Sequence, residues 1–473
     1  MKPSKNALLV AAALLALLSA PSARAGEASV PLVSGHAEAL PPGHAEALPP
    51  GLAGSAPPGL AGAAPPGLAD VLPPERPALD AILAHPLVSG ADSGLARERA
   101  ASERLRLGSY ETQLELGAQR LSPGETGGGP EVDWSVALSR PLRLPAKRDA
   151  DLEIGRSSVE RGAMAALDAR HETARMLLSR WFGLLRGEAA AAQAAGQVGV
   201  LGELADVVRR RMRAGDAARL EQLQAQAAQA YALGELEVAR QRVQVARIAL
   251  EREFPALAGM ELPRLDAAAG APVEPAGSRE DWVQRIMSID HELGMQRAES
   301  AVLRARALRI GAERTPDPSI GVRAATDRAR QDRVLGLFVS IPLAGGARVA
   351  AQREALALAD EGEARVAAVQ RRVLGAAQAA YETAYAGARA WRALSEALQR
   401  AQAAAGLAAR AFELGEGTLT EVLVARRAVL DATLAERSAR IDALEAHARL
   451  RLDAHLLWEL DGPDPDPASE PRS

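Results

Sequence analysis

The chain has 473 residues, of which 48% are hydrophobic and 25% charged but only 3% aromatic. So few aromatic residues, beside much Ala, Leu, Arg, Glu and Gln, are typical of long helices and not of an enzyme core. The absence of cysteine excludes disulfides, thiolate catalysis, cysteine-bound zinc and lipid attached to a cysteine. The net charge of -4 gives no basic excess, so we expect no nucleic-acid partner.

The first 25 residues are typical of a secretory signal peptide. Two lysines precede an apolar run over residues 7–20, and the Ala-Arg-Ala sequence at 23–25 has the small-x-small pattern of a cleavage site. A membrane anchor is the alternative, but the run is shorter than the roughly twenty residues that a spanning helix needs. The sequence therefore predicts export.

Residues 26–76 are expected to form a low-complexity tether. An octad such as GHAEALPP repeats from Gly35 to Pro74, and its paired prolines favour extended, polyproline-like chain with no packed core. His36 and His44 lie in copies of one octad, so we interpret them as copied residues and not as metal ligands. The tail at 461–473 is expected to be disordered.

Segments with strand periodicity lie within residues 109–142 and again within 318–343. In each, two runs alternate apolar with polar or small residues around a turn sequence, SPGETGGGP or TDRARQDR. We interpret GETGGGP as a hairpin turn and not as a phosphate-binding loop, because it lies between strands. One apolar face and about ten residues per strand suit a membrane β-barrel. A small soluble hairpin is the alternative, although isolated hairpins are barely stable.

Two segments without proline predict long helices. No proline occurs between Pro145 and Pro255 or between Pro342 and Pro463, and apolar residues follow a heptad-like spacing that is typical of coiled coils. We therefore expect helices within 146–254 and 347–460. A continuous helix over 146–213 would be about 100 Å long at 1.5 Å per residue.

The two halves of the chain are similar to each other. A shift of 200 residues places Trp181 on Tyr381 and Gly215 on Gly415. Each of these two glycines interrupts a helix pattern, which predicts a helical hairpin; a kink in one helix is the alternative. We therefore divide the chain into a first repeat, a linker and a second repeat, at 77–265, 266–277 and 278–460.

Four strands cannot close a barrel that leaves an open lumen. A barrel built from the strands of about three chains would enclose an aqueous pore, and the long helices would continue this pore as a tunnel. The expected fold is mostly α-helical, with a membrane β-barrel that several chains share.

This layout resembles that of the TolC-like outer-membrane efflux proteins over residues 77–460. Within that family, the chain is most similar to the outer-membrane subunits of cobalt–zinc–cadmium cation efflux systems. Three stretches carry this likeness: LSRPLRLPAKRDADLEIG (138–155), RRRMRAGDAARLE (209–221) and PDPSIGVRAATDRARQDRVLGLFVSIPLAGGAR (316–348).

The resemblance implies a homotrimer in contact with outer-membrane lipid, with a periplasmic helical tunnel. It also implies two partners, a periplasmic adaptor (membrane fusion) protein and a proton-driven inner-membrane pump of the resistance–nodulation–division type. The protein would be a passive duct for divalent heavy-metal cations, without enzymatic activity or cofactor. Without a cysteine for lipid attachment, anchoring would rest on the barrel alone. The alternatives are a duct for drugs or a secreted polypeptide, and a periplasmic adaptor or coiled-coil scaffold.

Glu221 and Glu421 are the candidate residues of the pore entrance. Each lies six residues after its turn glycine, about one and a half turns into the returning helix. The resemblance implies acidic residues that line the periplasmic entrance there, and rings of carboxylates favour cations. An ordinary solvated charge at a helix N-terminus is the alternative.

The hairpin tips are the expected surface for the adaptor, and three aromatic residues are candidates for a membrane girdle. The tip residues are Arg213, Gly215, Asp216, Leu220, Leu414, Gly415, Glu416, Thr418 and Leu419, and the girdle residues are Tyr110, Trp134 and Phe338.

No catalytic residue and no metal site are predicted. HExxH, P-loop and GxSxG motifs are absent from the sequence. His447 and His455 fall within one expected helix but are eight residues apart, which places them poorly as joint ligands.

Overall fold

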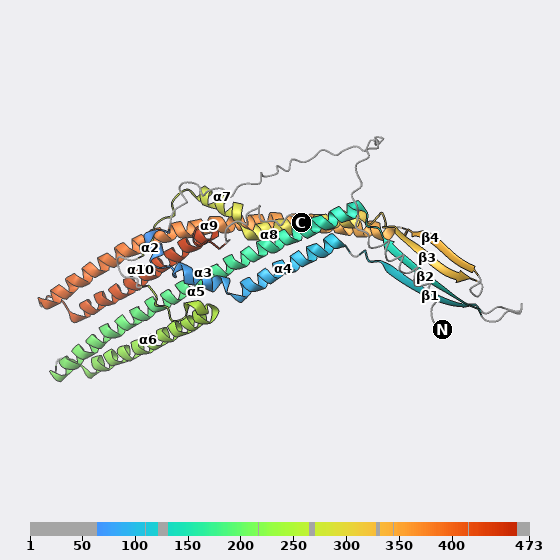
Figure 1. The fold of residues 1–473 in the computed structure, drawn as a ribbon. Coiled ribbons are helices and arrows are strands. Elements are labelled where there is room, and N and C mark those ends of the chain that lie inside the picture. Colours follow the sequence, from blue (N-terminus) through green and yellow to red (C-terminus); the bar gives the residue numbers. More distant parts are fainter. Residues whose placement is uncertain are drawn as a thin grey trace. The chain divides into compact units, whose positions relative to one another are not determined.

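The computed structural model describes most of the chain after residue 63, and all the described residues belong to the unit formed by residues 55–473 (Figure 1). The predicted signal peptide, most of the expected tether and the expected disordered tail lie outside the described residues. So do the whole of the first predicted turn sequence and part of the second. No helix among the described residues is both long enough and apolar enough to cross a membrane. The described ranges are 64–108, 110–121, 131–215, 217–263, 270–327, 332–343, 345–414 and 416–460.

Two helical hairpins dominate this unit. The first consists of α5 (Pro145–Arg213) and α6 (Arg219–Glu253), and the second of α9 (Gly346–Glu413) and α10 (Leu419–Asp453). Within each hairpin the two helices pack along each other (Figure 1). The prediction of one continuous helix over 146–213 is confirmed. Pro145 opens α5 at its first helical position, where its missing N–H leaves no hydrogen bond unmade.

The two hairpins correspond closely in sequence position. The bounds of α6, 219 and 253, become those of α10, 419 and 453, when 200 is added to each. Close helix approach follows the same shift: a Cβ on Gly187 would lie 3.4 Å from the side chain of Val243, and one on Gly387 would lie 3.3 Å from Ala443. These correspondences support the internal repeat.

Shorter helices flank the hairpins. Of these, α4 packs along α5, α8 packs along both α5 and α9, and α7 packs against α9. None of them was predicted individually, because residues 77–108 and 279–312 lie outside the two long proline-free segments on which the helix predictions were based. Their bounds are α2 (Pro66–Ala69), α3 (Glu75–Leu83), α4 (Pro86–Leu107), a 3-10 helix (Pro255–Leu257), α7 (Arg279–Ile289) and α8 (His291–Ala312).

The strands form one four-stranded antiparallel sheet in the order β1-β2-β3-β4 (Figure 1). They are β1 (Gln113–Leu121), β2 (Glu131–Pro141), β3 (Ser319–Asp327) and β4 (Asp332–Ser340), so the predicted strand pairs are confirmed. The central pairing of β2 with β3 joins the two halves of the chain.

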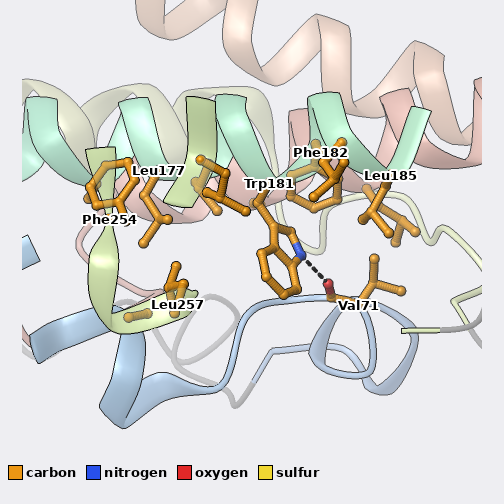
Figure 2. Packing of buried hydrophobic residues seen from close by; sticks show 14 of the residues in the cluster. Val71, Leu177, Trp181, Phe182, Leu185, Phe254 and Leu257 are labelled. Atoms are coloured by element: carbon orange, nitrogen blue, oxygen red, sulfur yellow. Dashed lines mark hydrogen bonds between the residues drawn. The ribbon is translucent and has the colours of Figure 1, made fainter. Parts of the chain in front are cut away.

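The main hydrophobic core surrounds Trp181 on α5 (Figure 2). Its side chain is 1% exposed, and its indole N–H donates a hydrogen bond of 2.8 Å to the carbonyl oxygen of Val71. Val71 and Leu68 are themselves buried in this core. The expectation of a tether without a core is therefore wrong for its last octad, GLADVLPP. That octad has Val71 and Leu72 where the two octads immediately before it have Ser-Ala and Ala-Ala, so it buries more apolar surface than they could.

The second half has a smaller counterpart of this core around Tyr381, the residue that corresponds to Trp181. Tyr381 packs with Trp282 and Ile286 of α7, and its hydroxyl donates a 3.4 Å hydrogen bond to the carbonyl oxygen of Gly277. Part of the expected linker is also packed, because a Cβ on Gly67 would lie only 2.6 Å from the carbonyl oxygen of Ala271. In each half of the chain, a short segment that precedes the strands thus packs against the long helices.

Candidate functional site at the hairpin tips and the sheet

The tip of the first hairpin turns through Gly215. This residue has φ +79°, the left-handed region that favours glycine, and its N–H donates a 3.1 Å hydrogen bond to the carbonyl oxygen of Met212. The chain re-enters a helix at Arg219, after Ala218, whose side chain provides no cap. Asp216 lies outside the described residues. The predicted turn, in place of a kink, is confirmed for this hairpin.

The tip of the second hairpin is closed by a capping box. The hydroxyl of Thr418 accepts a 3.2 Å hydrogen bond from the N–H of Glu421, and the carboxylate of Glu421 accepts one of 2.7 Å from the N–H of Thr418. The N–H groups of Glu416 and Gly417 donate to the carbonyl oxygen of Ala411 and so close the end of α9. Gly415 and the side chain of Leu419 lie outside the described residues.

Glu221 and Glu421 occupy equivalent places at the two tips. Each is the third residue of its helix and is exposed. The expectation that they lie one and a half turns into the helix is therefore wrong: the turns extend to residues 218 and 418, which leaves both carboxylates in the first turn. The backbone hydrogen bond from Thr418, and then the one with its side chain, lower the pKa of Glu421.

The other tip residues are largely solvent-facing. Leu220 and Leu414 are exposed apolar side chains, and Arg213 and Glu416 are exposed charges beside them.

Helices α5 and α10 join the two hairpins behind their tips. Arg426 of α10 pairs with Glu203 of α5. A small, mostly apolar cavity of about 240 Å³ lies between the same helices, and Leu204 and Leu423 are among its lining residues. Contacts between α5 and α10 therefore connect the two hairpins near their tips.

One face of the sheet is apolar across all four strands. The register pairs Leu116 with Val136, Val136 with Ala324, and Ala324 with Leu335, and directly paired residues share a face. On β4, Leu335 is 80% exposed and Leu337 is 86% exposed. A continuous exposed apolar face of this kind indicates contact with lipid or with another protein surface.

The opposite face carries small and polar residues. Gly117 pairs with Ser135, and Gly321 pairs with Phe338. The ring of Phe338 lies over Gly321, and the guanidinium of Arg323 lies 5.7 Å from the centre of that ring. Phe338 therefore lies on the face opposite to Trp134, and a girdle on the apolar face would not include it.

A charged network connects the strands to the long helices. Lys147, at the start of α5, is 1% exposed and lies 3.1 Å from a carboxylate oxygen of Glu313 and 3.0 Å from one of Asp317. The hydroxyl of Tyr110 donates a 3.0 Å hydrogen bond to Asp317, so this candidate girdle residue lies at the junction of sheet and helices. Although burial acts in the opposite direction, hydrogen bonds from Arg309 and Lys147 lower the pKa of Glu313.

Three histidines also lie together, and sequence reasoning missed them. His171 of α5, His291 of α8 and His455 form one group, whereas His447 lies in α10 and outside the group. The expectation that His455 shares a helix with His447 is wrong, because α10 ends at Asp453. The prediction of no metal site was based on spacing along the sequence and did not consider this group. No local motif could reveal a group whose members come from distant segments.

The fold is similar to that of several solved outer-membrane channels. The outer membrane protein VceC from Vibrio cholerae is 17% identical, with a TM-score of 0.65 over 80% of this chain and 95% of that one. The CmeC channel of Campylobacter jejuni is 13% identical, with a TM-score of 0.67 over 83% and 86%. The MtrE channel of Neisseria gonorrhoeae is 18% identical, with a TM-score of 0.59 over 83% and 90%.

No protein-family model matches the sequence, and no curated protein matches it either. At the identities above, the likeness concerns the fold. The chain has the fold of these outer-membrane channels: a small antiparallel sheet continued by two long helical hairpins.

The two tips make a matched pair for testing the cap. Thr418→Ala is expected to destabilise the start of α10 by about 1 kcal/mol, because a capping hydroxyl is lost. Ala218→Thr would create the Thr-x-x-Glu pattern with Glu221 and is expected to stabilise the start of α6. Native-state hydrogen exchange of the first-turn amides measures both changes; unchanged exchange in both variants would contradict the capping role.

The pH dependence of this cap follows from the lowered pKa of Glu421. A depressed carboxylate pKa means that the stabilisation is fully present above the ordinary value of 4.5 and is lost as the pH falls through the lowered value. Protection of the α10 start is therefore expected to decline on acidification in the parent protein. In the Thr418→Ala variant this decline should be weaker.

Proposed function

We propose that the chain is the outer-membrane subunit of a tripartite efflux system and conducts its cargo passively to the exterior. The observation that carries the proposal is the exposed apolar face of the sheet, at one end of the long helices, in a fold shared with outer-membrane channels. Lipid is the medium that suits such a face, with small and polar residues turned toward water. Localisation in the outer membrane, with helices in the periplasm, follows from this proposal.

The edges of the sheet favour assembly. Within the described chain, β1 and β4 each pair on one side only, which leaves two open edges. Open edges are satisfied when strands of neighbouring copies pair across them. Four strands are too few to surround a lumen, so a homotrimer that closes one shared barrel accounts for both features.

The hairpin tips are the proposed contact with a periplasmic adaptor protein, which would connect the duct to an inner-membrane proton-driven pump. The exposed Leu220 and Leu414, with Arg213 and Glu416 beside them, support this assignment. In this arrangement energy comes from the pump, and the duct itself performs no catalysis.

The proposed cargo is a divalent heavy-metal cation. This part rests on the resemblance of residues 138–155, 209–221 and 316–348 to subunits of cobalt–zinc–cadmium efflux systems. A duct for drugs or for a secreted polypeptide would use the same architecture. A periplasmic adaptor or scaffold is less favoured, because neither use explains the apolar sheet face.

Growth of a deletion strain on a panel of divalent metals and drugs tests the cargo. We expect sensitivity to one or a few metals, raised cellular metal content, and rescue by the intact gene. Sensitivity to drugs with normal metal tolerance would contradict the assignment of a metal cargo, but it would agree with the proposal that the protein is a duct. A barrel-disrupting variant, Leu337→Asp, serves as the control that should fail to rescue either phenotype.

Glu221 and Glu421 are proposed to line the entrance, with six carboxylates in a trimer. Their exposure and equivalent positions at the tips support this role. Such a ring attracts cations and repels anions through its charge.

The double variant Glu221→Gln/Glu421→Gln is expected to lower the ratio of cation to anion permeability in planar bilayers. Glu235→Gln/Glu237→Gln is the matched control, since it removes the same charge from exposed positions farther along α6. An equal effect of both double variants would argue against a specific role of the tip carboxylates.

A further inference from the structure

We propose that His171, His291 and His455 form a binding site for a divalent transition-metal ion such as Zn²⁺. The site would be a resident one within the helical part of the chain, separate from the tips and from the sheet. The inference does not depend on the cargo of the duct, because it rests on the arrangement of these three side chains alone.

The three imidazoles come within ligating reach of one another. Ligand nitrogens, one from each ring, all lie within 4.8 Å of each other. The ring centres of His171 and His455 are 4.1 Å apart, and each of the other two pairs is 4.8 Å apart. Around a tetrahedral zinc ion with Zn–N bonds of about 2.0–2.1 Å, the nitrogens would be about 3.3 Å apart. His171 and His455 are stacked, with 26° between their ring planes, so metal binding would turn these two rings until their nitrogens face one point.

The surroundings of the group favour a metal over three solvated histidines. His171 is 4% exposed and His291 is 8% exposed. Neutral imidazole nitrogens are good ligands for Zn²⁺ and its neighbours in the first transition row.

Each histidine is positioned by a definite local structure. His171 lies within the long helix α5. His291 is the first residue of α8, whose start is fixed by the Asp290 carboxylate, which accepts a 2.7 Å hydrogen bond from the N–H of Leu293. His455 follows the end of α10 with φ +53°, the one non-glycine residue with positive φ among those described.

His455 occupies the left-handed position of a Schellman motif at the end of α10. Its N–H donates a 2.9 Å hydrogen bond to the carbonyl oxygen of Leu452, and the N–H of Leu456 donates one of 2.7 Å to that of Arg451. This conformation ends α10 and places the imidazole beside that of His171.

Residues close in sequence to the three histidines line a cavity. Asp168 lies one turn before His171 on α5, and its carboxylate interacts electrostatically with His291. Asp168 also lines this cavity of about 880 Å³, together with Asp290 and Asp453, which are close in sequence to two of the histidines. Arginines line the cavity as well, and Arg175 pairs with Asp453 at 2.9 Å. Residues close in sequence to each histidine therefore line the cavity, whereas the group whose ligand atoms lie within 4.8 Å of one another consists of the three histidines and does not include Asp168.

A metal here would join parts of the chain that are far apart in sequence. It would tie α5 of the first half to α8 and to the segment after α10 in the second half. Because the unfolded chain does not hold these residues together, metal binding would stabilise the folded protein.

Zinc binding by the full-length protein in detergent tests the proposal. The parent for the test is His36→Asn/His44→Asn, which removes the octad histidines as competing ligands. We expect one tight Zn²⁺ per chain after chelator treatment and a higher thermal midpoint with Zn²⁺ than without. Co²⁺ in its place should give the visible absorption of a low-coordinate, nitrogen-ligated ion.

Two variants made in that parent test whether the three histidines bind the ion. His455→Asn keeps a residue that tolerates positive φ, so the backbone is preserved while the ligand is lost. His171→Asn removes a ligand from the centre of α5. Each is expected to weaken Zn²⁺ binding at least about 100-fold, because losing even a hydrogen-bond partner of a ligand costs about 10- to 100-fold.

The control is His447→Asn, a buried histidine outside the group, which should keep the tight site and the zinc-dependent rise in thermal midpoint. Absence of tight binding in the parent would overturn the proposal, as would unchanged affinity in His455→Asn. If His171→Asn fails to fold, the His455→Asn variant alone decides, because its effect on affinity is measured in a folded protein.

Discussion

The structure depends on one constraint: a four-stranded sheet exposes an apolar face that nothing in the described chain covers. The register makes this face continuous from Leu116 on β1 to Leu335 on β4. Apolar surface of this extent is unfavourable in water, so the fold is complete only beside lipid or another protein surface. The open edges at β1 and β4 add a second unmet requirement, which neighbouring copies of the chain would satisfy.

The buried charges at the sheet–helix junction serve this arrangement. Lys147 holds carboxylates from the segment between α8 and β3, while Arg143 and Arg309 both pair with Asp151 of α5. These contacts fix the direction in which the strands continue into helices in both halves. Removing one member would leave an uncompensated charge in a poorly hydrated place, which is strongly destabilising. The network therefore fixes the sheet against the start of α5 and the end of α8.

Much of this fold could be predicted because its signals are periodic and local. The strand faces follow a period of two, and the long helices follow from segments without proline between Pro145 and Pro255 and after Pro342. Prediction from local sequence patterns failed where tertiary contacts determine the structure. Val71 looked like one more octad residue but is buried against Trp181. The three histidines come from α5, α8 and the end of α10, so no spacing rule could join them.

The most direct test of the duct is the environment of the two sheet faces. Because the chain has no cysteine, single-cysteine variants report one position each. Leu337→Cys lies on the apolar face, and Ser340→Cys lies on the opposite face of the same strand. In native membranes, a water-soluble maleimide should label the Ser340→Cys protein, while a fluorophore on the Leu337→Cys protein should be quenched by brominated lipid. Equal labelling of both variants from water, without quenching by lipid, would contradict a membrane-embedded channel.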